Sequence, residues 1–259
     1  TQVRAIAEVA TAVTKGDLTR FIQVDASGEV AELKDYINAM IGNLRETTDR
    51  NTEQDWLKTN LAKFSRMMQG QRDLFTLAQT LLSELVPLMN AHQGVMYIMH
   101  AENGAPVARQ LAGYADMYEG EEPRRYRLGE GLVGQCLVEK QRLMLSDIPS
   151  DSIRIGSGLL VAHPRNVLVL PVLFEGEVKA VIELASLNAF TAPHLAFLEQ
   201  LTGSIGIVLN TIEATMRTEG LLQQSQQLAA ELQAQQRELQ QTNDELAQKA
   251  RLLPAQSAE

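Results

Sequence analysis

Few residues of this 259-residue chain have a type and spacing that suggest chemistry. Arg154 is the most suggestive, because it lies between Ile153 and Ile155. A guanidinium held against apolar neighbours can bind a carboxylate or a phosphate through two parallel hydrogen bonds. A structural ion pair with Asp147 or Asp151 explains the same arginine without a ligand. Both interpretations remain open at the level of sequence.

The remaining reactive side chains argue against catalysis. Cys136 is the only cysteine, which excludes an internal disulfide, a cysteine-based zinc site and a two-cysteine redox cycle. His92, His100 and His194 are scattered and lack metal-ligand spacing. No phospho-acceptor histidine motif, nucleotide-binding glycine motif or Ser/His/Asp set is present. We therefore expect no enzyme activity in this stretch, no cofactor and no metal.

Composition limits the partners and the compartment. The formal net charge is −9, so nucleic acid is an unexpected partner, since no basic surplus exists to neutralise phosphates. No run of about 18 apolar residues and no signal peptide is visible. We expect a cytoplasmic protein. The opening at Thr1 and the polar ending PAQSAE suggest a piece of a longer parent, which is possibly membrane-anchored.

The elements that must position any site begin with two helices in residues 1–52. Apolar residues spaced 3-4-3 form a first seam, and a 3-4-3-4 series forms a second one. Gly16 ends the first helix in a position suited to a left-handed cap. The seams are Val3, Ile6, Ala10 and Val13, and then Val30, Leu33, Ile37, Met40 and Leu44. Two short helices of this kind need a partner pair to bury their seams.

This segment resembles a HAMP domain. The matching residues are VATAVTKGDLT at 9–19, Gly28, and GEVAELKDYINAMIGNLR at 28–45. The resemblance implies a parallel homodimeric four-helix bundle that relays conformational change. A generic two-helix dimerisation hairpin is the alternative. Residues 53–73 continue as a polar helical linker with a sparse seam, which suits a joint with two arrangements.

Residues 74–213 contain the strands. The stretch NVLVLPVLFEGEVKAVIELAS at 166–186 predicts a β-hairpin, in which Lys179 and Glu183 interrupt the second apolar run. Pro171 indicates a bulge or an unpaired site. Further strands are expected at 94–100, 108–114, 125–128 and 142–145, a helix at 74–88, and a last helix capped by Thr191.

This order resembles a GAF domain. The matching motifs are LGEGLVG at 128–134, SDIP at 146–149, the proline-containing hairpin, and Phe190-Thr191 before the last helix. The resemblance implies an α+β fold: a six-stranded antiparallel sheet with flanking helices and a small-molecule pocket over one face. Ala189 replaces the lysine of the cyclic-nucleotide class. The bilin-binding class is disfavoured because Cys136 lies inside the GLVGQC helix, and the methionine-sulfoxide-reducing class because it needs several cysteines. By position in the family fold, the candidate ligand-binding residues are Tyr97, Cys136, Arg154, Ile155, Ser157 and His163.

Residues 214–253 predict a coiled coil, followed by a tail at 254–259. Leu232, Leu239, Leu246 and Leu253 recur every seven residues, with Asn243 at a position that fixes register. The segment resembles the helix that precedes the dimerisation domain of bacterial hybrid sensor kinases.

The order of the HAMP-like, GAF-like and coiled-coil segments resembles the sensory region of a bacterial two-component sensor kinase, which implies a non-catalytic sensory and relay module. It would form a homodimer through parallel helices, bind an unidentified small molecule or relay a change from the HAMP-like pair, and act on a downstream kinase domain. The alternative is a dimerisation scaffold whose GAF domain is filled by its own side chains.

Overall fold

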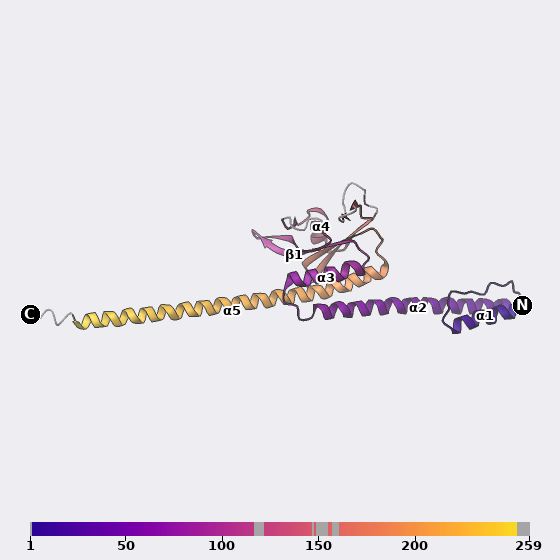
Figure 1. Ribbon diagram of the computed structural model, residues 1–259, viewed down its shortest axis with the longest axis horizontal. Helices are drawn as coiled ribbons and strands as arrows, with labels where there is room; N and C mark the ends of the chain where they lie inside the picture. Colours follow the sequence, from indigo (N-terminus) through magenta and orange to yellow (C-terminus); the bar gives the residue numbers. More distant parts are fainter. Residues whose placement is uncertain (1, 117–121, 147, 149–154, 157–160, 253–259) are drawn as a thin grey trace, which may run out of the picture. The chain divides into compact units, whose positions relative to one another are not determined.

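The computed structural model describes residues 2–116, 122–146, 148, 155–156 and 161–252 (Figure 1). Two of the candidate residues, Arg154 and Ser157, lie outside this described part. The chain divides into two compact units: Thr1–Gln69 with Asn188–Thr202, and Gly70–Leu187 with Gly203–Glu259.

The first unit contains the two expected N-terminal helices. α1 spans Gln2–Thr14 and α2 spans Glu29–Met68. Gly28 precedes α2 with φ 59°, a conformation that glycine adopts without a Cβ penalty. The connector is held to α2 by Asn38, whose Oδ1 accepts from the Ile22 amide at 2.8 Å. α2 runs without interruption across residues 52 and 53, where the HAMP-like pair was predicted to give way to the linker.

An aromatic contact forms between α2 and the beginning of α5 (Ala192–Leu252) within this unit. The ring of Phe197 lies 5.5 Å from Trp56 and 5.5 Å from Phe64, both edge-on. Phe64 and Phe197 are fully buried. Thr191 is confirmed as the cap of α5, because its hydroxyl accepts from the His194 amide at 3.4 Å.

The second unit contains the predicted six-stranded sheet, and all of its pairings are antiparallel. Its order is β3-β2-β1-β8-β7-β4. The bounds are β1 Gln93–Glu102, β2 Ala105–Tyr114, β3 Arg125–Arg127, β4 Leu143–Ser146, β7 Asn166–Phe174 and β8 Glu177–Ser186. A separate ribbon pairs β5 (Ile155–Gly156) with β6 (Val161–Ala162).

The predicted hairpin forms the centre of this sheet, as β7 and β8. β8 lies between β1 and β7. The register of the hairpin shifts between Val172 and Leu173, one residue beyond Pro171, where a bulge was predicted. The α+β fold class with a six-stranded antiparallel sheet and flanking helices is confirmed.

Helices cover one face of the sheet. α3 (Leu74–Leu88) is capped by Asp73, whose carboxylate accepts from the Thr76 amide at 2.7 Å. Gly94 of β1 leaves room for α3, since a Cβ there would lie 2.6 Å from the Val86 side chain. α5 approaches β7 equally closely at Gly206, where a Cβ would overlap the Leu173 carbonyl. Small residues thus set the spacing between helices and sheet.

α5 also contains the one helical window among the described residues that is long and apolar enough to cross a membrane. The 18-residue window has a mean hydropathy of 1.3, and 44% of it is buried inside the molecule. A buried core helix passes the same test of length and composition, so the window is weak evidence for an anchor.

Candidate functional site

An apolar cluster lines the sheet face opposite α3, beneath α4 (Gly131–Glu139). Strands β1, β7 and β8 supply most of it through alternate residues, and α4 closes it from above. Its buried members are Val95, Tyr97, Ala108, Val133, Cys136, Leu137, Ile155, Val167, Val169, Val181 and Ala185. The structure thus brings together three of the predicted candidates, Tyr97, Cys136 and Ile155. His163 is half-buried just after β6 and is not a member of the cluster.

Glycine allows α4 to lie this close to the strands. A Cβ on Gly134 would overlap the Arg127 carbonyl oxygen, and Gly131 begins the helix with φ 59°. Cys136 is fully buried beneath α4, and its thiol lies 3.4 Å from the Gln141 carbonyl. Burial raises the pKa of this thiol to about 12. Cys136 is therefore a neutral packing residue and not a nucleophile.

One carboxyl group lies within this apolar face. Glu183 is on central strand β8, directly between Val95 of β1 and Val169 of β7. Its Oε2 accepts a hydrogen bond of 3.0 Å from the Tyr97 hydroxyl. Burial raises the pKa of Glu183, and the Tyr97 hydrogen bond and the Arg124 charge only partly oppose that shift. Burial likewise raises the pKa of Tyr97. The pair is thus a polar group held in an apolar setting.

A second polar group borders this pair. The Arg124 guanidinium contacts the Asp116 carboxylate at 2.6 Å, and the Asp116 side chain is only 1% exposed. Gln110 donates to Asp116 at 2.7 Å and accepts from Arg124 Nε at 3.1 Å. Gln93 donates to the other Asp116 oxygen at 3.3 Å. Each buried side-chain nitrogen and oxygen in the described part of the chain has a hydrogen-bond partner.

Only Glu183 of this network stands out in the sequence, as a polar interruption of an apolar strand. Asp116 follows β2 and Arg124 precedes β3, where no periodicity indicates a pairing. The arrangement can recognise polar atoms of a ligand inside an apolar surface. Among the described residues, no group of three or more His, Cys, Asp or Glu side chains could hold a metal.

Comparison with known proteins identifies the family. Residues 71–210 match the GAF domain family model. This match covers more than half of the chain, which therefore belongs to the GAF domain family. Family membership supports a sensory or signalling role.

Several solved structures are similar to this chain at low sequence identity. The GAF domain of a phosphoenolpyruvate-protein phosphotransferase from Coxiella burnetii is 19% identical with a TM-score of 0.50, covering 64% of this chain and 96% of that one. The corresponding Acinetobacter domain is 16% identical, with a TM-score of 0.48 and coverages of 60% and 92%. The GAF domain of a two-component sensor histidine kinase from Bacillus halodurans is 15% identical, with a TM-score of 0.45. The match covers 56% of this chain and 99% of that one. At such identities, a likeness concerns the fold alone.

Proposed function

We propose that this chain is the sensory and relay part of a bacterial two-component sensor kinase. Its GAF domain would bind a small molecule on the face beneath α4, and parallel helices of a homodimer would carry the change to a downstream kinase domain. The module itself would be non-catalytic and cytoplasmic. The GAF family assignment supports the sensory part of this proposal.

The observation that carries the ligand proposal is Glu183. A carboxyl group between two valines on a central strand opposes folding, because burial disfavours its charged form. A purely structural sheet would be more stable with an apolar residue there. Together with Tyr97, Glu183 offers one acceptor and one hydroxyl to a polar ligand. Sites that bind small molecules combine such groups with apolar walls.

The relay proposal is supported by the exposed surface of α5. Leu232, Leu239 and Leu246 are 57%, 70% and 59% exposed and are spaced by seven residues. Such a row needs a partner, and a second copy of the same helix carries the same row in the same register. The HAMP-like seam of α2 is exposed in the same way at Leu33, at 49%, and Leu44, at 42%.

A ligand-free scaffold is the second candidate. It is favoured by the hydrogen bonds within the site, since Tyr97 satisfies Glu183 without a ligand. In this case the cluster would be filled by its own side chains, and the domain would only transmit strain between helices.

Native mass spectrometry of the purified chain, followed by denaturation, tests these alternatives. The sensor proposal expects a dimer with a reproducible small-molecule mass that is released on unfolding. Glu183→Gln should lose that mass, whereas Glu177→Gln, an exposed position on the same strand, should keep it. A dimer without added mass after expression in several media would favour the scaffold. A monomer would contradict the helix pairing.

A further inference from the structure

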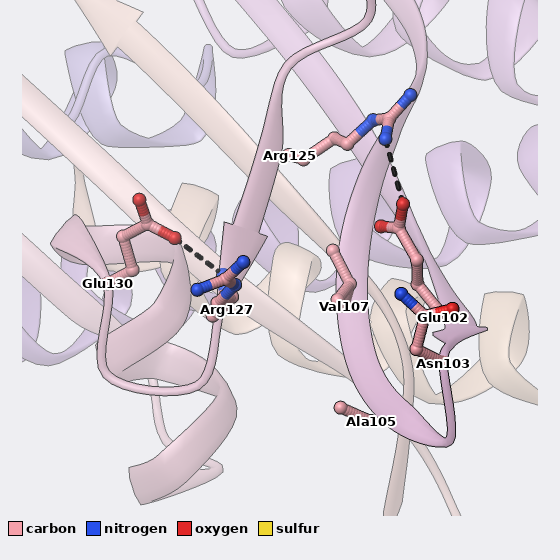
Figure 2. A pocket seen from close by; sticks show the side chains of 7 residues that line it. All are labelled: Glu102, Asn103, Ala105, Val107, Arg125, Arg127 and Glu130. Atoms are coloured by element: carbon pink, nitrogen blue, oxygen red, sulfur yellow. Dashed lines mark hydrogen bonds and ion pairs between the residues drawn. The ribbon is translucent and has the colours of Figure 1, made fainter.

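A row of three hollows lies along β1, β2 and β3, on the sheet face opposite Tyr97. Their volumes are about 560, 240 and 360 Å³. The first and second share Glu102 and Arg125, and the second and third share His100 and Arg109. They therefore form one continuous surface, which we call the arginine groove. Figure 2 shows its largest hollow.

Three arginines concentrate positive charge in this groove. Arg109 of β2 is directly opposite Arg125 of β3, and Arg127 follows on the same face of β3. Like charges directly opposite each other destabilise a sheet. Arg125 is paired with Glu102 at 2.9 Å, as Figure 2 shows. No carboxylate among the described residues pairs with Arg109 or Arg127. Among the described lining residues, the three arginines exceed the two carboxylates of Glu102 and Glu130 by one positive charge, in a chain whose net charge is −9.

Glu130 limits how a partner can bind. Its carboxylate accepts from the Arg127 backbone amide at 2.9 Å (Figure 2). That amide belongs to the edge strand of the sheet, so an incoming strand cannot use it to extend the ladder. Recognition in the groove therefore depends on side chains.

The spacing of the arginines fits an extended chain. Arg109 and Arg127 are diagonal neighbours across β2 and β3, a separation of about 7–8 Å. Carboxylates on alternate residues of an extended peptide lie about 6.5 Å apart, which two long arginine side chains can reach. Glu102 and Glu130 also line the groove and repel any anion placed beside them. A peptide can place carboxylates at the two arginines alone, whereas nucleic acid carries a phosphate at every nucleotide, so the peptide fits better.

We propose that the arginine groove binds an extended acidic segment of a partner protein, with Arg109 and Arg127 receiving carboxylates on alternate residues. Arginine suits this role because its guanidinium binds a carboxylate through two parallel hydrogen bonds. This surface is distinct from the face beneath α4, and the proposal does not depend on a small-molecule ligand there.

Fluorescence anisotropy with the full chain tests this proposal. The probe is a short fluorescein-labelled peptide in which glutamate alternates with serine. We expect binding that weakens as salt is added, and an affinity loss of about tenfold or more in the double variant Arg109→Gln/Arg127→Gln. The matched control is Arg142→Gln, an exposed arginine just before β4 at the opposite edge of the sheet, which should bind the peptide as the wild type does. Far-UV circular dichroism verifies the fold of each variant.

Three outcomes would overturn the proposal. The first is equal affinity of the double variant and the wild type. The second is equal binding of a peptide with glutamine in place of glutamate, because the negative charge of the peptide would then not contribute to binding. The third is displacement of the peptide by single-stranded oligothymidylate at lower concentration than by unlabelled peptide, which would indicate a nucleic-acid surface.

Discussion

Glu183 makes the stability of the domain depend on pH. Its pKa is raised in the folded state, so the folded protein binds more protons than the unfolded chain as pH rises above the ordinary value of 4.5. The unfolding free energy contributed by this group is therefore greatest at low pH and is lost as pH rises through the folded pKa. Glu183→Gln removes this dependence. In urea titrations, we expect the variant to gain stability relative to wild type as pH rises above 4.5.

Glu177→Gln is the control for this experiment, because Glu177 is exposed at the start of the same strand. Its difference from wild type should stay constant over the same pH range. A Glu183→Gln variant whose relative stability also stays constant would show that Glu183 is not buried as described.

Cys136 should not react with thiol-alkylating reagents in the native protein. Its thiol is fully buried, and burial raises its pKa to about 12, so almost no thiolate exists at neutral pH. We expect no iodoacetamide adduct by intact-mass analysis in native buffer and complete modification in urea. Rapid labelling without denaturant would mean that α4 opens readily.

Some residues of the candidate site were predictable and others were not. Tyr97, Cys136 and Ile155 were predicted from their place in the family fold, and they lie in one buried cluster; a ligand role for them remains a prediction. Asp116 and Arg124 were missed because their pairing depends on the register of β2 and β3, which local sequence does not contain.

At the scale of elements, the packing of α5 on β7 depends on Gly206. A Cβ there would overlap the Leu173 carbonyl. Relieving this overlap would require the backbone of α5 or of β7 to move. We expect Gly206→Ala to lower the unfolding free energy by about 2–4 kcal/mol. Gly203 is in the same helix with nothing within 4 Å of its added Cβ. Gly203→Ala should instead stabilise by about 0.5–1 kcal/mol, since alanine favours helix. Urea denaturation compares the two, and equal effects would contradict this packing.

The long elements were predictable from periodicity, and the shortest ones were not. The β7–β8 hairpin shows two apolar runs around a glycine turn, and α3 shows an apolar stripe, so both were expected. The two-residue strands β5 and β6 are too short to have a period. The polar positions Thr47, Asn51 and Gln54 weaken the seam of α2 without ending the helix, because helix continuity depends on backbone propensity as well as on burial.

At the scale of the whole molecule, self-association should depend on the leucine row of α5. Leu239 is 70% exposed in the single chain and becomes buried only if a second helix pairs with it. We expect Leu239→Lys to weaken the dimer at least tenfold in analytical ultracentrifugation, because a charge would then lie in the seam. Gln235→Lys, beside the seam on the same helix, is the control and should leave the dimer intact. A wild-type chain that sediments as a monomer would remove the basis for the relay proposal.

The unbroken course of α5 from Gly206 to Leu246 fixes the angular phase of the leucine row relative to the sheet. Each helical residue rotates the chain by about 100° about the helix axis. Deleting one residue near Gly220 would therefore rotate every later leucine by that angle relative to the GAF domain, without changing a residue of the domain. Removing seven residues would restore the phase almost completely. If α5 carries a signal as proposed, the angle of the leucine row about the helix axis should therefore matter more than its distance from the domain.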